Sequence, residues 1–238
     1  MKTAMILAAG RGERLKPLTE KSPKAMCLVG QRPLIEHHVD KLAGSGFERI
    51  IINHAYLGSA IRRHFGKGNK WGVEICYSPE PPGGLETGGG IYSALSLLGE
   101  KPFVTVNADV FTDYDFSSLT LSEGKMVNLV LVNNPEHNNK GDFDLIDQGQ
   151  LSNQNKRYTF AGIACYHPQA FHQSQIGRYS VTPLLHELVS KQLATGELYQ
   201  GLWVDIGSAE RLRFANEIFD RQQAHFPHST LTQFLNDF

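Results

Sequence analysis

Residues 4–19 read Ala-Met-Ile-Leu-Ala-Ala-Gly-Arg-Gly-Glu-Arg-Leu-Lys-Pro-Leu-Thr. The apolar residues at the start of this stretch predict a buried strand, which breaks at Gly10. The loop that follows contains Arg11, Gly12 and Arg14. A loop of this kind presents backbone N–H groups and guanidinium groups to phosphate oxygens. The stretch therefore predicts a strand followed by a phosphate-binding loop.

Two other phosphate-binding loops do not fit these residues. The P-loop ends in Gly-Lys-Ser or Gly-Lys-Thr, and the dinucleotide-binding loop needs a third glycine where Leu15 stands. A flexible surface loop is the remaining alternative. Residues 10–24 contain five cations and two acids, whereas the whole chain has a net charge of −1. This concentration of positive charge favours phosphate binding.

The composition is that of an ordinary globular protein. The 238 residues are 41% hydrophobic and 20% charged, which is enough to bury a sizeable core. The near-zero net charge argues against a nucleic-acid-binding or membrane-binding surface. Cys27, Cys76 and Cys165 lie far apart, as is typical of reduced cytoplasmic thiols. No stretch approaches the ~20 apolar residues that span a bilayer, so we expect a cytoplasmic protein with no membrane partner.

Short apolar strands alternate with amphipathic helices along the chain. The predicted strands are residues 3–8, 50–52, 73–77, 103–106, 127–132, 158–166 and 202–205. Helices are predicted from Pro33 to Gly44, at 57–65, at 181–190 and at 208–223. Another helix is predicted to follow the loop 78–90 and to end at Leu98, and a short appended helix is predicted at 226–238. Residues 133–156 are polar and predict loops and a hairpin. The pattern predicts an α/β fold: a Rossmann-like, mixed but mostly parallel central sheet with helices on both faces.

Four candidate residues lie just past the ends of predicted strands. They are Gly10, Asn53, Glu80 and Asp109. In open α/β sheets, ligands bind beyond the carboxyl ends of the strands. We therefore expect the four loops that carry these residues to meet at one crevice.

The amino-terminal motif is long enough to indicate a family. Residues 7–19, followed by Pro23-Lys24 and Pro33-Leu34-Ile35, resemble the sugar-1-phosphate nucleotidyltransferases. These enzymes join a nucleoside triphosphate to a sugar 1-phosphate and release pyrophosphate. The resemblance implies their nucleotide-diphospho-sugar transferase fold over a single domain, 1–238. It also implies that residues 1–125 mainly bind the nucleotide and residues 126–225 mainly bind the sugar phosphate.

Nucleotidyl transfer needs in-line positioning and cations near the phosphates more than covalent help from the protein. Arg14 and Lys24 are the catalytic candidates. We expect Arg14 to hold the β- and γ-phosphate oxygens and Lys24 to bridge the sugar phosphate and the α-phosphate. The alternative for each is a solvated surface cation.

A magnesium ion is expected because two anionic phosphates must approach each other, and Mg²⁺ is bound by one or two carboxylates with phosphate oxygens and water. Asp109 and Asp205 follow apolar strands, where an aspartate is often only a turn residue. The resemblance instead implies that both bind the metal, because they match the N-x-D and W-x-D-x-G motifs of the family.

The remaining site residues are also implied by the resemblance. The triphosphate would contact Ala9, Gly10, Arg11 and Gly12, and the nucleobase pocket would be formed by Glu80, Glu86, Thr87 and Gly88, with support from Asn53. Asp142 lies where relatives contact the sugar. Many larger relatives carry an E-K-P lysine nearby, which is missing here, and Lys140 and Arg157 are the cations that could replace it.

Several segments, including 52–58, 106–116 and 134–137, resemble the family's uridylyltransferases that act on N-acetylmuramic acid 1-phosphate in cell-wall recycling. The expected partners are UTP and this sugar 1-phosphate, with a monomer or a dimer both possible. The alternatives are a guanylyltransferase for mannose or heptose 1-phosphate, a glycosyltransferase using a D-x-D motif at 113–115 or 142–144, and a non-catalytic nucleotide-sugar sensor.

Overall fold

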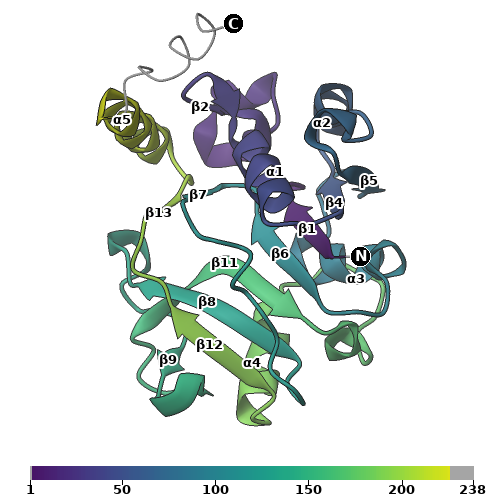
Figure 1. Ribbon diagram of the computed structural model, residues 1–238, viewed down its shortest axis with the longest axis vertical. Helices are drawn as coiled ribbons and strands as arrows, with labels where there is room; N and C mark the ends of the chain where they lie inside the picture. Colours follow the sequence, from purple (N-terminus) through teal and green to yellow (C-terminus); the bar gives the residue numbers. More distant parts are fainter. Residues whose placement is uncertain (1, 226–238) are drawn as a thin grey trace, which may run out of the picture.

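The computed structural model describes residues 2–225, and the helix predicted at 226–238 lies outside the described residues (Figure 1). The central sheet has seven strands in the order β12-β8-β11-β6-β1-β4-β5. They are β1 (Thr3–Leu7), β4 (Arg49–His54), β5 (Glu74–Pro79), β6 (Phe103–Asn107), β8 (Val127–Asn133), β11 (Tyr158–Tyr166) and β12 (Ala194–Leu198). Within this sheet, β11 runs antiparallel to both of its neighbours and the other pairs are parallel. The predicted mixed, mostly parallel sheet is confirmed.

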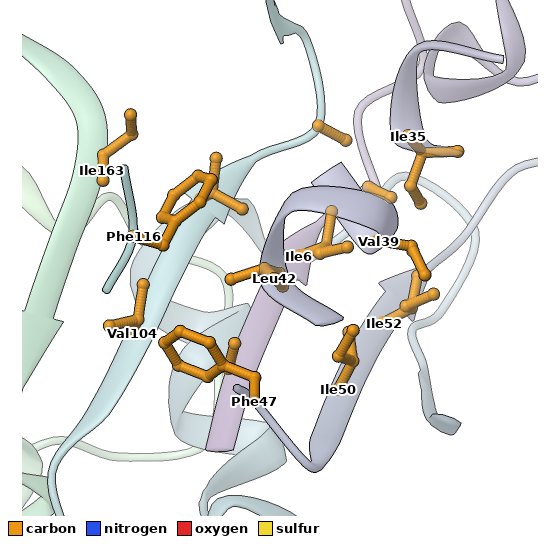
Figure 2. Close-up of a cluster of buried hydrophobic side chains, with 14 of the residues drawn as sticks. Ile6, Ile35, Val39, Leu42, Phe47, Ile50, Ile52, Val104, Phe116 and Ile163 are labelled. Atoms are coloured by element: carbon orange, nitrogen blue, oxygen red, sulfur yellow. The ribbon is translucent and has the colours of Figure 1, made fainter. Parts of the chain in front are cut away.

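Helices pack on both faces of the sheet because alternate strand residues point to opposite sides. The helices α1 (Leu34–Gly44) and α2 (Gly58–Phe65) cover one face, and α3 (Glu86–Leu98) and α4 (Thr182–Ser190) cover the other. On the first face, Ile6 of β1 packs with Ile35 and Val39 of α1 (Figure 2). Its neighbour Met5 belongs to the core cluster of the opposite face.

The fifth helix completes a third, smaller core. Here α5 (Ala209–His225) packs with β2 (Leu28–Val29), β7 (Val110–Thr112) and β13 (Trp203–Asp205). Leu15, from the loop after β1, is buried in this cluster beside Phe111, Val204 and Ile206. Ser208 was expected near the start of this helix, and its hydroxyl oxygen accepts a hydrogen bond from the Arg211 N–H at 3.3 Å. The third core thus anchors the amino-terminal loop to the carboxyl-terminal part of the chain.

The remaining elements are short. The strands β3 (Arg32–Pro33), β9 (Asp144–Leu145) and β10 (Leu151–Ser152) form two-stranded pairs, and the β9–β10 pair is the hairpin expected within 133–156. The 3₁₀ helices are η1 (Glu13–Leu15), η2 (Leu18–Glu20), η3 (Lys24–Met26), η4 (Asn69–Trp71), η5 (Glu136–Asn138), η6 (Asp147–Gly149) and η7 (Pro168–Phe171). Within residues 2–225, no helix has the length and apolarity needed to cross a bilayer.

Four strands were not expected from the sequence, namely β2, β3, β7 and β12. The strand β12 reads Ala-Thr-Gly-Glu-Leu, which lacks a regular apolar alternation, yet it pairs with β8 along five residues. Backbone pairing along the open edge of β8 favours this strand independently of its side-chain pattern. The strand β7 is only three residues long, and its extended conformation is stabilised by pairing with β13.

We predict that Leu15→Ala destabilises the protein by about 2–5 kcal/mol, because Leu15 is 1% exposed and its truncation leaves a cavity in the third core. The free energy of unfolding in urea measures this change. Leu18→Ala, in the same loop, is the matched control because Leu18 is 52% exposed. We expect it to change stability by less than about 0.5 kcal/mol. Equal losses in the two variants would contradict the role assigned to Leu15.

Candidate active site

A cleft of about 420 Å³ opens beyond the carboxyl ends of β1, β4 and β6. Of the expected site residues, it is lined by Ala9, Gly10, Arg11, Gly12, Arg14, Lys24, Asn53, Glu86, Thr87 and Asp109. Glu80, Gly88, Asp142 and Asp205 do not line it. The parallel strands explain this convergence, since their carboxyl ends meet at the same edge of the sheet.

The loop after β1 is held in shape around Gly12. Gly12 has a φ of 69°, a left-handed conformation that favours glycine. A Cβ at this position would lie 2.9 Å from Cβ of Lys24 and 2.9 Å from Cγ2 of Thr19. The Thr19 hydroxyl donates a hydrogen bond to the Gly12 carbonyl at 2.8 Å. The glycine therefore allows the loop to fold back tightly onto the segment that carries Lys24.

Lys24 and Asp109 form an ion pair through Nζ and Oδ2. The Lys24 side chain is only 13% exposed, so it is part of the cleft wall rather than a solvated surface cation. Arg14 also lines the cleft, but it is exposed, and no ion pair to it is present within the described part of the chain. Lys24 is thus neutralised by a carboxylate, whereas Arg14 is open to an anionic ligand.

Arg11 lies farther out on the same loop. Its Nε lies 2.7 Å from Glu13 Oε1, and its guanidinium lies 5.2 Å from the centre of the Tyr56 ring. The Tyr56 hydroxyl donates a hydrogen bond to the carbonyl of Glu20 at 2.8 Å. Tyr56 therefore connects the segment after β4 to both ends of the phosphate-binding loop.

Glu80 and Asn53 connect three loops beneath the cleft. Asn53 Oδ1 accepts a hydrogen bond from the Ala8 N–H at 2.7 Å, and its Nδ2 donates to Glu80 Oε1 at 2.6 Å. The other oxygen of Glu80 accepts from the Leu85 N–H at 2.6 Å. Both carboxylate oxygens of Glu80 are therefore engaged inside the protein. In this arrangement Glu80 positions the loops around the cleft.

The glycines at the start of α3 allow close packing of another segment. A Cβ on Gly88 would lie 2.6 Å from the Tyr179 ring, and a Cβ on Gly89 would lie 2.0 Å from the Gly177 carbonyl oxygen. The N–H groups of Gly88 and Gly89 donate to the Tyr179 carbonyl at 3.0 and 3.2 Å. Tyr179 in turn donates its N–H to the Leu85 carbonyl at 3.1 Å. The 177–179 segment is thereby fixed against the amino terminus of α3.

This packing brings Arg178 into the cleft wall, a residue that sequence reasoning missed. Its Nε lies 3.3 Å from Glu86 Oε1, and its side chain is 62% exposed. Arg178 lies in the connection that precedes α4, and no motif marks it in the sequence. The order of the strands and the glycines of α3, rather than any local pattern, place it near the phosphate-binding loop.

Asp109 and Asp205 come together through the pairing of β7 with β13. Asp205 is opposite Val110 in this pairing, and the Ile206 N–H donates to the Asp109 carbonyl at 2.8 Å. Asp205 Oδ2 accepts from Arg211 Nη1 at 2.8 Å and lies 3.1 Å from His137 Nε2. Asp205 lines a neighbouring hollow of about 450 Å³ rather than the cleft itself.

The two aspartates suit a magnesium ion in the nature of their donor atoms. Each offers hard carboxylate oxygen, and Asp109 Oδ1 and Asp205 Oδ1 accept no hydrogen bond from residues 2–225. The described residues contain no cluster of three or more His, Cys, Asp or Glu side chains that would enclose a metal ion. A pair of carboxylates fits Mg²⁺, whose other ligands are typically water and phosphate oxygens.

The other aspartates in acidic pairs have structural partners. Asp142 Oδ2 accepts from the Phe160 N–H at 2.8 Å, away from the cleft. Asp144 is buried and pairs with Arg157 Nε at 2.6 Å, so this arginine is engaged within the hairpin region. In the other motif, Asp113 accepts from the Leu202 N–H at 2.8 Å, and Asp115 accepts from the Ser117 N–H at 2.9 Å. Neither D-x-D motif forms an open carboxylate pair.

The buried thiols do not provide a nucleophile at neutral pH. Burial raises the pKa of Cys27, which lies just after η3, and it raises the pKa of Cys165 in β11 to about 11. Both side chains therefore remain protonated at neutral pH, where only a thiolate would react readily. His38 in α1 carries no charge at neutral pH, because burial lowers its pKa to about 4 and keeps the ring neutral.

The chain is similar to known proteins along most of its length. A family model described as Nucleotidyl transferase matches residues 3–222. A protein of Neisseria meningitidis serogroup B, named N-acetylmuramate alpha-1-phosphate uridylyltransferase, is 43% identical over 224 residues, covering 90% of this chain and 97% of the relative. A protein of the same name from Caulobacter vibrioides is 29% identical and covers 88% of this chain and 93% of its own length.

More distant similarities are also present. A mannose-1-phosphate guanylyltransferase catalytic subunit beta from Drosophila pseudoobscura is 28% identical over 86% of this chain, which spans 58% of that relative. A solved structure of a UDP-glucose pyrophosphorylase matches the fold with a TM-score of 0.76 at 17% identity, covering 93% of this chain and 99% of that one. A solved structure from Bacillus anthracis has a TM-score of 0.79 at 20% identity, covering 92% and 94%.

The two solved structures agree with the observed sheet and confirm the expected fold class. The family model spans nearly all of the described residues, and the Neisseria relative is similar along almost its entire length. The long amino-terminal motif, the cleft that it lines and these similarities lead to one conclusion: this chain is an enzyme of the nucleotidyl transferase family.

Proposed function

We propose that this enzyme transfers a uridylyl group from UTP to N-acetylmuramic acid 1-phosphate in a magnesium-dependent reaction. The products are UDP-N-acetylmuramic acid and pyrophosphate, and the proposed role is in peptidoglycan recycling. The name and the 43% identity of the Neisseria relative support the choice of substrates. The observation that carries the chemistry is the convergence of Arg14, Lys24 and Asp109 on one cleft.

In the proposed mechanism, backbone N–H groups of residues 9–12 and the Arg14 guanidinium bind the β- and γ-phosphates. Lys24 lies between the α-phosphate and the incoming sugar phosphate. A sugar phosphate oxygen attacks the α-phosphorus in line, a new P–O bond forms, and the bond to the bridging oxygen of the pyrophosphate breaks. The cations stabilise the charge that develops on the departing pyrophosphate. No group on the protein is covalently modified in this step.

Asp109 and Asp205 would hold the magnesium ion, which supplies Lewis-acid neutralisation of the phosphate oxygens when it is bound. Arg178 is the cation that we assign to the sugar phosphate in place of the missing E-K-P lysine, because it lines the same cleft. Glu86 and Thr87 would form the wall of the nucleobase pocket, and Glu80 would fix that wall through Leu85 and Asn53. The cytoplasmic location expected from the sequence remains a prediction.

We predict that Asp109→Asn and Asp205→Asn each lower kcat at least about hundredfold, because electrostatic stabilisation of the transition state is lost. The affinity for UTP should fall by less than about tenfold, since the amides and cations of the loop remain. Pyrophosphate release and calorimetric UTP binding measure the two effects.

Asp115→Asn is the matched control for these variants. An asparagine side-chain oxygen can accept the same hydrogen bond from the Ser117 N–H, so we expect activity within about twofold of wild type. Near-normal activity of both Asp109→Asn and Asp205→Asn would exclude them from the metal site. Loss of activity in Asp115→Asn would instead favour a D-x-D enzyme.

A panel of substrates tests the specificity. We predict that kcat/KM for pyrophosphate release is at least about tenfold higher with UTP than with GTP. We expect it also to be at least about tenfold higher with N-acetylmuramic acid 1-phosphate than with mannose 1-phosphate. The similarity to the guanylyltransferase from Drosophila makes GTP with mannose 1-phosphate the specific alternative. A preference for that pair would replace the proposed substrates while leaving the reaction type unchanged. Consumption of a UDP-sugar with no pyrophosphate formed would contradict nucleotidyl transfer itself.

A further inference from the structure

Arg211 is a charged residue in the first turn of α5 to which the proposed mechanism assigns no role. Its Nη1 donates to Asp205 Oδ2 at 2.8 Å, and the ring of His137 lies against the same nitrogen, with Nε2 at 2.8 Å. The Arg211 side chain is 20% exposed. Because contacts from two segments hold it, this guanidinium has a defined orientation.

The other terminal nitrogen of Arg211 reaches over Gly207, which lines the cleft. A Cβ built on Gly207 would lie 2.2 Å from Arg211 Nη2 and 3.1 Å from Arg14 Nη2. Gly207 does not have the positive φ that would itself require glycine. Because Gly207 has no side chain, the space in which the two guanidinium groups converge is not filled.

The convergence leaves positive charge unbalanced at this wall of the cleft. Asp205 lies beside Arg211, but Arg14 has no ion pair within residues 2–225. Two guanidinium groups repel each other unless an anion lies between or beside them. The planar donors of arginine match phosphate oxygens in pairs, so two adjacent arginines suit a ligand with more than one phosphate.

We propose that Arg211 is a second guanidinium contact for the β- and γ-phosphates of the bound nucleoside triphosphate and for the pyrophosphate product. It acts with Arg14 across Gly207. Asp205 and His137 position its guanidinium by holding Nη1, and Nη2 is the nitrogen that lies over Gly207 at the edge of the cleft. This inference rests on the proposed nucleotidyl transfer, but it does not depend on the identity of the nucleobase or the sugar.

A different role for Arg211 would be to hold the Asp205 carboxylate for the metal ion without touching phosphate. The two roles differ in a measurable way. A metal-mediated effect requires Mg²⁺, whereas a direct contact with phosphate contributes to binding in its absence. UMP lacks the β- and γ-phosphates, so its affinity reports only the nucleoside and α-phosphate contacts.

The experiment is calorimetric titration of UTP, pyrophosphate and UMP, with Mg²⁺ and with EDTA, into wild type, Arg211→Gln and Gly207→Ala. In Arg211→Gln we expect the affinities for UTP and pyrophosphate to fall about tenfold under both conditions, and the affinity for UMP to change less than about twofold. Gly207→Ala keeps both charges and places a methyl group where the guanidinium groups meet. We expect it to weaken the same two ligands. Thermal unfolding confirms that each variant is folded.

Arg213→Gln is the matched control, because Arg213 lies two residues further along α5, is exposed and is not among the side chains that converge on Gly207. We expect its affinities to match those of wild type. Three results for Arg211→Gln would each overturn the proposal. The first is an equal loss of affinity for UMP and UTP, and the second is a loss of UTP affinity that disappears in EDTA. The third is an unchanged affinity for both UTP and pyrophosphate. The pyrophosphate titration needs no nucleobase, so its result separates this inference from the choice of UTP. If the wild type prefers GTP, the proposed function fails, and GTP with GMP tests Arg211 in the same way.

Discussion

The antiparallel pairing of β7 with β13 is the constraint on which the site depends. It places Asp205 beside the backbone of Asp109, although the two residues are distant in sequence. Phe111 and Val204 of the same pairing, and Ile206 just after β13, are buried with Leu15 in the third core. The apolar contacts that stabilise this core therefore also hold the two carboxylates near the phosphate-binding loop. Stability and site geometry depend on the same few side chains.

Close backbone approach is the second physical feature of the site. At Gly12 the chain adopts a left-handed conformation and packs against Lys24, and at Gly88 it packs against Tyr179. A side chain at either position would separate segments that now touch. These glycines allow the segments around the cleft to pack closely, although glycines in a loop are often taken to indicate flexibility. A preorganised cleft suits a reaction that depends on positioning and electrostatics.

Both halves of the chain contribute charge to the cleft. Arg14 and Lys24 come from the first half, whereas Arg178 comes from the second, which also places Asp205 beside the backbone of Asp109. The chain as a whole has a net charge of −1, so the positive potential is local to these loops. The division into a nucleotide-binding part and a sugar-phosphate-binding part is thus compatible with one shared cleft. The proposed phosphate contact of Arg211 adds a further charge from the second half of the chain.

The sequence by itself determined the α/β class, the order of most strands and helices, and the loop that contains Arg14. It could do so because apolar periodicity and turn residues report local conformation directly. The family motif also identified Lys24 and Asp109, which the structure brings into an ion pair.

The tertiary structure alone decided the inward orientation of Glu80, the position of Arg178 at the cleft and the pairing that makes β12 a strand. These features depend on which segments meet across the sheet and on how closely glycines let them approach. No local pattern encodes such long-range contacts, because each one is fixed jointly by residues that are far apart in the chain.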